Sequence, residues 1–441
     1  MSALVFLHLS DIHFRKNAGT TYDQFKDLRN ELELDLKTFS NENFERLEGI
    51  FVTGDIAFSG IADEYEIAFT WLKHISEMLD LSPAEKVKVI PGNHDIHRDT
   101  IRESKTLQGY HRDLRNAGES LNDTLVGFLE SDKEARRILY KPLQAYVDFA
   151  ARFQCNISAD RPFWEDPHTL NDGSKLIVRG MNSTLISDEH DTDASHKLVV
   201  GNHQLEMTRQ DGVEYMSLCH HPPPWLLDQD EAENLLTDRA RIQLFGHKHK
   251  HRLVSIENSV RLVAGAMQPD KREPLWQPRY NFVAIEVLRN GADQRSMQVT
   301  VYPRVFDGLH FGPTDAVGVS KIYNLSLEPW SQNPASTVAV PPDEPVVPTI
   351  SVSTEGGLDM GPGRRLTYRF LSLPYHERLK IVQQLNLVRP DDEGLRDSEL
   401  YPRYFARASE RKHLHELWNL INQYSGENQE NPFEPSKGGT G

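Results

Sequence analysis

The sequence predicts an α/β fold in which two stacked β-sheets lie between layers of helices. Short apolar runs that end in polar or glycine-containing turns predict strands at residues 3–9, 49–53, 87–90, 175–178, 213–219 and 241–245. Helix-like stretches separate many of these runs, at about 22–39, 62–79 and 138–153. Four later strands follow one another without clear helices, at 253–256, 261–264, 280–288 and 297–303. These later strands indicate an antiparallel extension or a second sheet.

A change of composition divides the chain into two folded parts. Proline, serine, threonine, valine and glycine become dense after the last predicted strand, which is typical of a linker. We therefore expect a first domain over 1–325, a Pro-rich linker over 326–363, a small helical domain over 364–424 and a disordered tail over 425–441. Within the first domain, residues 98–167 read as largely helical. This insertion caps the active site or is an ordinary layer of packing helices.

The helical domain is predicted by apolar residues at the three- and four-residue spacing that forms one face of a helix. The three sets are Tyr375, Leu379, Val382 and Leu385, then Leu400, Tyr404, Phe405 and Ala408, and finally Leu414, Leu417, Trp418 and Ile421.

The charge and cysteine content exclude several classes of protein. The 441 residues carry 49 Lys and Arg against 65 Asp and Glu, a net charge of −16, which disfavours a protein that grips duplex phosphates through a broad basic surface. It does not exclude an enzyme that meets phosphate through bound cations. Two cysteines cannot frame a disulfide scaffold. So few cysteines indicate a reduced compartment, and we expect a cytoplasmic protein. No apolar run approaches the roughly 18 residues of a membrane helix, so we expect no membrane partner.

Five short motifs follow predicted strands and carry carboxylate, amide and imidazole groups. They are Asp11-Ile12-His13, Gly54-Asp55, Gly92-Asn93-His94-Asp95, His220-His221 and Gly246-His247-Lys248-His249. This mixed nitrogen and oxygen set suits two divalent transition metals. Because ligand sites in open α/β sheets collect beyond the carboxyl ends of strands, we expect the five motifs to meet there.

The motifs differ in how specific they are. Asp-x-His recurs at 95–97, 166–168 and 188–190, so it means little alone. Gly-Asn-His recurs at 201–203, but Gln204 follows it where the other copy has an acid, and we treat this copy as a decoy. Gly-Asn-His-Asp and Gly-His-x-His are rarer, and their occurrence in order with the other motifs is the strong signal.

With these five blocks in this order, residues 3–305 resemble the calcineurin-like binuclear metallophosphoesterases. The resemblance is closest to bacterial members that carry the patterns found at Leu7–His13, Thr53–Gly60 and Gly180–Ser183. It implies a four-layer α/β/β/α sandwich and two divalent metal ions, with Mn²⁺ expected and Fe or Zn²⁺ also accepted by such ligands.

The resemblance also implies a role for each motif residue. Asp11, His13 and His249 would bind one metal, Asn93, His220 and His247 would bind the second, and Asp55 would bridge both. His94 would protonate or stabilise the leaving oxygen, and Asp95 would orient the His94 imidazole. The choice between His220 and His221 as the ligand stays open, and His221 would otherwise lie near the substrate or support a ligand.

Three further residues near the motifs are candidate phosphate contacts: Arg15, Arg98 and Asn182. For Asn182, a simple turn role is the alternative.

The expected activity is hydrolysis of a phosphodiester in a nucleic acid or nucleotide by a metal-activated water. The block His220-His221-Pro222-Pro223 is similar to that of cyclic-nucleotide phosphodiesterases, so a cyclic nucleotide is an alternative substrate. Two further functions stay open, a phosphomonoesterase and a non-turnover sensor of a phosphorylated ligand.

Residues 364–424 resemble helical effector-associated adaptor domains of bacterial conflict and antiphage systems, through Phe370-x-x-Leu373-Pro374-x-x-x-Arg378 and Leu414-x-x-Leu417-Trp418. The resemblance implies an antiviral-defence effector that is coupled to a protein partner. Packing on the catalytic domain or self-association is the alternative.

Overall fold

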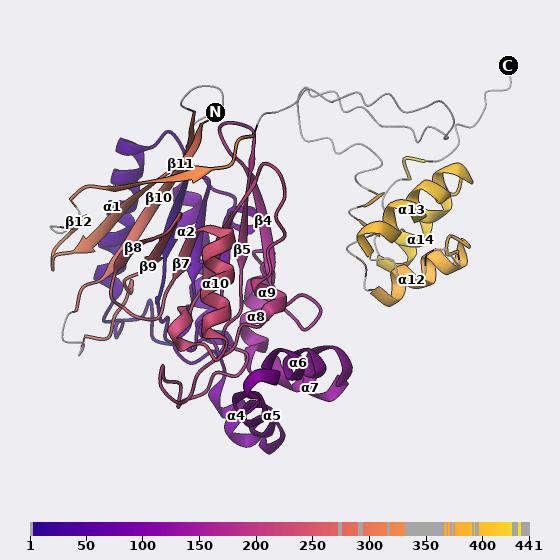
Figure 1. The fold of residues 1–441 in the computed structure, drawn as a ribbon, viewed down its shortest axis with the longest axis horizontal. Coiled ribbons are helices and arrows are strands. Elements are labelled where there is room, and N and C mark those ends of the chain that lie inside the picture. The colour runs from indigo at the N-terminus through magenta and orange to yellow at the C-terminus, as the bar shows by residue number, and fades with distance from the viewer. Residues whose placement is uncertain are drawn as a thin grey trace. The chain divides into compact units, whose positions relative to one another are not determined.

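The chain forms two compact units, Met1–Thr337 and Val338–Gly441 (Figure 1). The computed structural model describes residues 3–271, 276–289, 294–314, 318–330, 366–367, 369–370, 373, 375–389, 392, 397–425 and 431–433. The predicted linker over 326–363 and the predicted tail over 425–441 lie mostly outside these residues. No described helix combines the length and the apolar character that crossing a membrane requires.

The first unit contains a seven-stranded sheet in the order β12-β11-β10-β1-β2-β3, with β13 also paired to β11. Its strands are β1 Leu4–Leu9, β2 Gly49–Thr53, β3 Val87–Ile90, β10 Arg279–Arg289, β11 Arg295–Phe306, β12 Phe311–Pro313 and β13 Lys321–Leu327. β1, β2 and β3 are parallel, and every residue in them is buried, which explains their continuous apolar runs.

A second, six-stranded sheet has the order β4-β5-β6-β7-β9-β8. Its strands are β4 Trp164–Thr169, β5 Lys175–Gly180, β6 Val213–Cys219, β7 Ala240–Phe245, β8 Arg252–Ile256 and β9 Ser259–Val263. The four central strands are parallel, and the edge strands β4 and β8 are antiparallel to their neighbours. The prediction of two sheets in one α/β unit is therefore confirmed.

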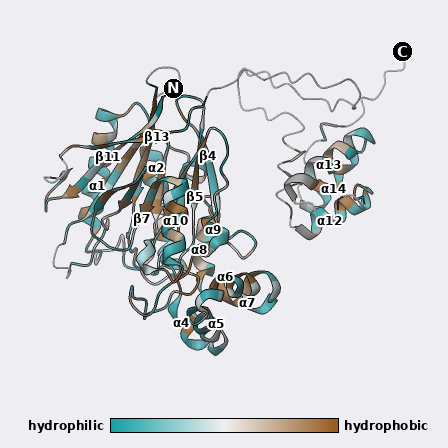
Figure 2. Ribbon diagram, viewed as in Figure 1, coloured by the Kyte–Doolittle hydropathy of each residue, from teal (hydrophilic) through white to brown (hydrophobic). Residues whose placement is uncertain are grey.

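Helices cover the sheets on their outer sides. Phe39 of α1 (Lys26–Asn43) stacks on Phe282 of the first sheet, and α10 (Gln229–Arg239) packs against β6 and β7 of the second. The other helices before the insertion are α2 Ala62–Met78 and α3 Pro83–Lys86, and α9 Asn202–Leu205 precedes β6. Figure 2 shows the apolar residues concentrated on the strands, and the order α/β/β/α is consistent with the predicted sandwich.

The insertion after β3 is helical up to α8 and then turns into a strand. Its helices are α4 Arg98–Glu103, α5 Lys105–Arg115, α6 Leu121–Val126, α7 Lys133–Leu139 and α8 Gln144–Ala151. Figure 1 shows α4 to α7 grouped beyond one end of the sheets. The predicted helical insertion over 98–167 thus includes the start of β4, where Trp164 and His168 face inward and the charged residues between them do not.

Two asparagine side chains join the sheets by imitating a strand backbone. Asn171 donates to the carbonyl of Val287 (2.9 Å) and accepts from the N–H of the same residue (2.6 Å). Asn258 makes the same pair of bonds with Ser326, both of 2.7 Å. These contacts connect the turns of the second sheet to β10 and β13 of the first.

A charged cluster also ties β4 to the first sheet. Oε1 of Glu48 lies 3.4 Å from Nδ1 of His168 and 2.6 Å from Nζ of Lys86. Nε2 of His168 lies 3.1 Å from Asp166. The hydrogen bonds from His168 and then Lys86 outweigh the effect of burial and lower the pKa of Glu48 from 4.5 to about 2.

We expect this cluster to make stability depend on pH in acid. Because the pKa of Glu48 is lower in the folded chain, its contribution is present above pH 4.5 and is lost as the pH falls towards about 2. Thermal unfolding followed by circular dichroism across this range should show a shallower loss of stability in Glu48→Gln than in the unchanged protein. Equal slopes for the two proteins would contradict the assignment.

The second unit is helical, as predicted. Its helices are α12 Tyr375–Gln384, α13 Asp397–Glu410 and α14 Leu414–Ser425. They surround an apolar core that includes Phe370, Ile381 and Trp418. Within this core, Arg407 binds both carboxylate oxygens of Asp392, at 2.5 and 2.7 Å.

Candidate metal centre

The five motif blocks meet at the carboxyl ends of strands from both sheets. The backbone N–H of His247 donates to Oδ2 of Asp11 (3.3 Å), and Nδ1 of His220 lies 2.7 Å from the carbonyl oxygen of Thr53. Both contacts cross from the second sheet to the first. The blocks are residues 11–13 after β1, 54–55 after β2, 92–95 after β3, 220–221 after β6 and 246–249 after β7.

Most of the candidate ligands sit on a left-handed backbone, which non-glycine residues rarely adopt. The φ angles are 53° for Asp11, 54° for His13, 53° for Asp55, 68° for His247 and 51° for His249. Each such residue costs about 1–2 kcal/mol and persists only where its surroundings hold it. For His13, the backbone N–H donates to the carbonyl of Asp55 at 2.9 Å. Strain of this kind clusters at functional sites.

Gly54 allows the second block to approach His220. Its φ is +89°, and a Cβ at this position would lie 2.5 Å from Nδ1 of His220. A larger residue would therefore displace the histidine as well as strain the turn.

A first group of side chains surrounds Asp11 and His13. Nε2 of His249 lies 3.2 Å from Oδ1 of Asp11, and Nε2 of His13 lies 3.2 Å from Oδ2 of Asp55. Asp11, His13 and His249 each offer a ligand atom, and these atoms lie within 4.8 Å of one another. Oγ of Ser10 donates to the other carboxylate oxygen of Asp11 at 2.5 Å, which fixes that carboxylate.

A second group surrounds Asn93 and His247. Oδ1 of Asn93 lies 3.0 Å from Nδ1 of His247 and 3.2 Å from Nε2 of His221. The ring nitrogens of His220, His221 and His247 again lie within 4.8 Å of one another. Asp55 belongs to two further groups, one with His13 and His94 and one with Asp11 and His220, so this carboxylate stands between the two sides of the site.

The two neighbouring histidines differ in what their ring nitrogens contact. Nδ1 of His220 donates to the carbonyl of Thr53, and its fully buried Nε2 has no hydrogen-bond partner among the described residues and lies 3.4 Å from Oδ2 of Asp55. His221 has both nitrogens engaged, with Oγ of Ser183 at 2.8 Å and with Asn93. A ligating histidine usually donates its other nitrogen to a carbonyl, so the geometry favours His220.

The electrostatics fit a cation site. Burial alone would raise the pKa of Asp55, but His220 and His94 outweigh it and hold the pKa well below its usual range. Burial would also raise the pKa of Asp11, but the neighbouring His249 outweighs burial and lowers this pKa. Two ionised carboxylates are thus buried side by side. Nε2 of His220 has no hydrogen-bond partner among the described residues, and together these donor atoms match those that bind divalent metals. Burial lowers the pKa of His247 to about 3, so its imidazole is neutral, as a ligand requires.

The predicted contact between Asp95 and the His94 imidazole is wrong. The carboxylate of Asp95 accepts from the backbone N–H groups of Ile56 (3.1 Å), Ala57 (2.9 Å) and Gly92 (2.8 Å) and from the hydroxyl of Tyr65 (2.9 Å). Nδ1 of His94 instead donates to the carbonyl of Phe58 at 2.8 Å. Asp95 therefore holds the loop that carries Asp55, because its oxygens are used by backbone donors of that loop.

The candidate phosphate contacts separate into two kinds. Asn182 is buried, and its Oδ1 accepts from the N–H and hydroxyl of Thr184, both at 2.8 Å, so it closes a turn. Arg15 lies with its guanidinium carbon 3.4 Å from the centre of the Phe58 ring, and it forms no ion pair with a described residue. Arg98 is the first residue of α4, directly after the loop that carries the third block. Burial is the main cause of the lowered pKa of His94.

The decoy motif lies apart from these groups. His203 is in α9, and Gln204 beside it supports the turn by accepting from the N–H of Asn182 at 2.8 Å. His203 belongs to none of the candidate metal groups formed by the described part of the chain.

Two aromatic residues at the site are not indicated by the motifs. The Phe58 ring lies 5.3 Å from the ring of His94, and the Trp225 ring lies 4.0 Å from that of His247. Phe58 lies within residues 53–60, and Trp225 follows His221 after three prolines, Pro222-Pro223-Pro224. The sequence therefore indicates these two residues through their position next to motif residues.

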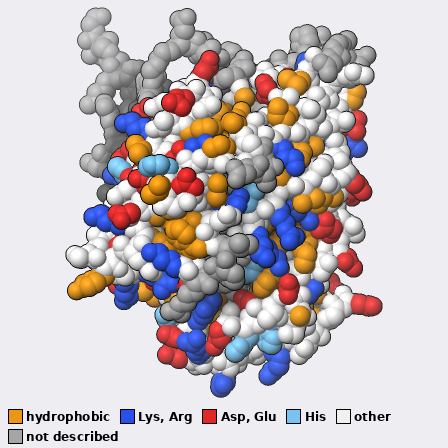
Figure 3. Space-filling view, turned by 90° about the vertical axis from the view of Figure 1, so that its left-hand side faces the viewer, with side chains coloured by type: hydrophobic (Ala, Val, Ile, Leu, Met, Phe, Trp, Pro, Cys, Tyr) orange, Lys and Arg blue, Asp and Glu red, His pale blue; other side chains and the backbone are white. Residues whose placement is uncertain are grey.

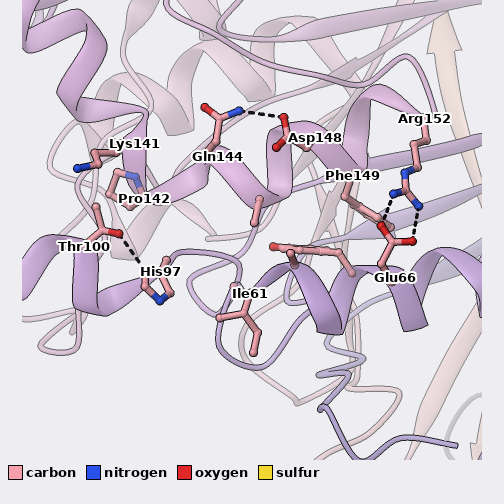
Figure 4. Close-up of a pocket in the computed structure, with 14 residues that line it drawn as sticks. Ile61, Glu66, His97, Thr100, Lys141, Pro142, Gln144, Asp148, Phe149 and Arg152 are labelled. Carbon is pink, nitrogen blue, oxygen red and sulfur yellow. Dashed lines mark hydrogen bonds and ion pairs between the residues drawn. The ribbon is translucent and has the colours of Figure 1, made fainter.

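A separate pocket of about 390 Å³ lies behind Asp95, between α2, α4 and α8. Figure 4 shows His97 bonded to Thr100 and the ion pair of Glu66 with Arg152 at its wall. Tyr65, which donates to Asp95, also lines it. None of the motif residues named above as candidate ligands lines this pocket.

The family relationship of the sequence agrees with this geometry. Residues 4–251 match the family described as calcineurin-like phosphoesterase, which is more than half of the chain. The chain belongs to the calcineurin-like phosphoesterase family. Members of this family bind divalent metals and act as hydrolases on phosphoesters, in agreement with the candidate groups of Asp and His.

This calcineurin-like phosphoesterase also carries a second recognised domain. Residues 363–423 match the GTPase-associated adaptor domain, which confirms the predicted adaptor region. A curated relative, the uncharacterized metallophosphoesterase-like protein YydB of Bacillus subtilis (strain 168), is 26% identical over 343 residues, which are 74% of this chain and 61% of that protein. The chain thus spans about three fifths of the length of this relative.

Solved structures resemble the phosphoesterase only remotely. Vacuolar Protein Sorting 29 from Cryptosporidium parvum is 12% identical with a TM-score of 0.31, covering 74% of this chain and all of that one. A putative 5′-nucleotidase from Staphylococcus aureus is 12% identical with a TM-score of 0.33, covering 75% and 55% of the two chains. Likeness at this level says nothing about the substrate of this chain.

Proposed function

We propose that this phosphoesterase hydrolyses a phosphodiester of a nucleic acid or nucleotide with two divalent metal ions, Mn²⁺ being the expected metal. The observation that carries the proposal is that Asp55 is shared by ligand groups on both sides of the site. Asp11, His13 and His249 would hold one metal with Asp55. Asn93, His220 and His247 would hold the other.

When bound, such a pair of metals supplies an activated water and neutralises phosphate charge. The chain itself supplies proton transfer and orientation. The Nδ1–H of His94 is fixed by the carbonyl of Phe58, which leaves Nε2 to face the substrate. In its imidazolium form His94 would give the Nε2 proton to the leaving oxygen and become a neutral imidazole. Arg15 lies over Phe58, whose ring is beside that of His94, and would orient the phosphate. Arg98, at the start of α4, would be a second phosphate contact.

The adaptor domain supports a protein partner for the phosphoesterase. Residues 363–423 match a domain whose description is that of an adaptor, and its core is independent of that of the first unit. We propose that it recruits a partner, or a second copy of the chain, through helical contacts. In either case the phosphoesterase is the effector of a larger assembly.

A hydrolysis panel tests the proposed activity. The full chain, stripped of metal and reloaded with Mn²⁺, is assayed on single- and double-stranded DNA, RNA, cyclic AMP, bis-p-nitrophenyl phosphate and p-nitrophenyl phosphate. His13→Ala should abolish turnover. His190→Ala, in an exposed Asp-x-His copy that belongs to none of the candidate metal groups of the described residues, should not.

Each result of the panel leads to a different conclusion about the substrate. Cleavage of a nucleic acid or of bis-p-nitrophenyl phosphate supports the proposal, and turnover of cyclic AMP alone makes the protein a cyclic-nucleotide phosphodiesterase. Turnover of the monoester alone, or tight ligand binding without any turnover, contradicts the proposal.

A further inference from the structure

Trp225 packs against the metal centre and not against the apolar core. Its ring contacts those of His247 at 4.0 Å and His221 at 6.0 Å, and Nζ of Lys248 lies 4.9 Å from its centre. Trp225 is partly exposed and is absent from the described residues that form or border the core. Its Nε1 is shielded and has no hydrogen-bond partner in the described part of the chain. Figure 3 shows that histidine and basic side chains reach the surface of the molecule among apolar ones.

The usual structural role of tryptophan does not explain this position. A tryptophan that stabilises a fold buries its ring among apolar side chains and gives its N–H a partner. Trp225 does neither, whereas Trp164 does both, since it lies in the core and donates to the carbonyl of Val89 at 2.9 Å. The ring of Trp225 is therefore available to a ligand at the second metal group.

On the opposite side of the site, near the first metal group, the polar side chain available to a ligand is the cation of Arg15. The Phe58 ring contacts both the guanidinium of Arg15 and the ring of His94, so it is already engaged by groups of the site. The Phe58 ring under Arg15 lies 6.3 Å from the ring of His13 and 5.3 Å from that of His94, so Arg15 is on the side of the first metal group. The two flanks therefore present different chemistry to the two ester groups of a phosphodiester.

We propose that Trp225 binds the nucleobase of the substrate by stacking with it, on the nucleoside side of the phosphodiester. Trp225 would thereby favour substrates that carry a base over those that carry none. The second ester group then leaves towards His94 and Arg15. Base–aromatic stacking tolerates every base because each has a π-face. The ammonium of Lys248, already over the ring and paired with Asp193 at 3.2 Å, is displaced when the base stacks. This inference rests on the proposed phosphodiesterase activity.

Two chromogenic diesters with the same leaving group test the inference. The p-nitrophenyl ester of thymidine 5′-monophosphate carries a base, and methyl p-nitrophenyl phosphate does not. We expect the unchanged full chain, loaded with Mn²⁺, to prefer the nucleoside ester in kcat/KM, mainly through KM. Trp225→Ala should reduce this preference by about tenfold or more, the range of base stacking. Trp225→Phe should keep most of it.

Trp330→Ala is the matched control, because Trp330 is a partly exposed tryptophan that packs on Gly212, at the other end of β6. It should leave the preference unchanged. Because Trp225 touches His247, only the ratio of the two esters is diagnostic, since loss of both rates reports damage to the metal centre.

The outcomes separate the two proposals. If the methyl ester is hydrolysed and the preference is absent, or survives in Trp225→Ala, the stacking role is wrong and the phosphodiesterase activity stands. If neither ester is hydrolysed and the panel shows no cleavage of any other phosphodiester, both are wrong. If neither ester is hydrolysed but a nucleic acid is cleaved and Trp225→Ala cleaves it as well as the unchanged chain, only the stacking role is wrong. Competition by a single-stranded oligonucleotide at lower concentration than thymidine 5′-monophosphate would assign the base to nucleic acid, and the reverse order would assign it to a free nucleotide.

Discussion

Asp55→Asn is expected to abolish metal-dependent hydrolysis, with a loss of at least about a thousandfold in kcat/KM. Losing several kcal/mol of charge stabilisation corresponds to that factor. The amide keeps the shape of the side chain but removes the charge that both ligand groups share. The measurement is the steady-state rate on a diester substrate together with the metal content of the dialysed protein, which should fall from two ions per chain.

The matched control is Asp188→Asn, in an Asp-x-His copy that pairs with Arg115 at 2.8 Å and belongs to none of the candidate metal groups of the described residues. It should retain both metals even if it lowers stability. Retention of two metals and of activity in Asp55→Asn would contradict the shared-ligand assignment.

His94→Ala is expected to affect substrates according to their leaving group. A poor leaving group, such as a nucleoside hydroxyl, needs the proton from Nε2 of His94, so its rate should fall by about 10²–10⁴-fold. A p-nitrophenolate leaves without protonation, and its rate should fall much less. Metal content should not change, because Nδ1 of His94 bonds to the carbonyl of Phe58 and His94 lies outside the proposed ligand sets.

Comparing an oligonucleotide with bis-p-nitrophenyl phosphate measures this difference. His97→Ala serves as the matched control, because His97 is three residues further on but bonds to Thr100. Equal losses on both substrates would show that His94 acts through the metal centre or the loop and not on the leaving group.

The parts of the site that depend on residue type and order can be predicted from the sequence. Because each motif ends a buried strand, the sheets bring all seven candidate ligands together without further information. The role of Asp95 cannot be predicted, since it depends on which backbone donors the loop at 56–57 presents. Trp225 escapes prediction for a related reason, because no motif spacing indicates which aromatic side chain lacks core contacts.

The fold shows the same division. Strands that are buried on both faces are continuous apolar runs and can be predicted nearly to the residue. β4 and α10 cannot, because charged residues interrupt the alternation in β4 and only Ala232 and Leu236 of α10 are buried. The secondary structure of these two segments depends on contacts with the neighbouring sheet, and the local sequence pattern carries no information about those contacts.

Fold stability and metal binding favour different residue types where the backbone is left-handed. The five positions are Asp11, His13, Asp55, His247 and His249. Glycine at any of these positions would relax the turn and so favour the folded chain without metal. The same change would delete a ligand. A chain engineered for thermal stability alone would therefore gain from glycine at these positions and lose the residues that would hold its metals.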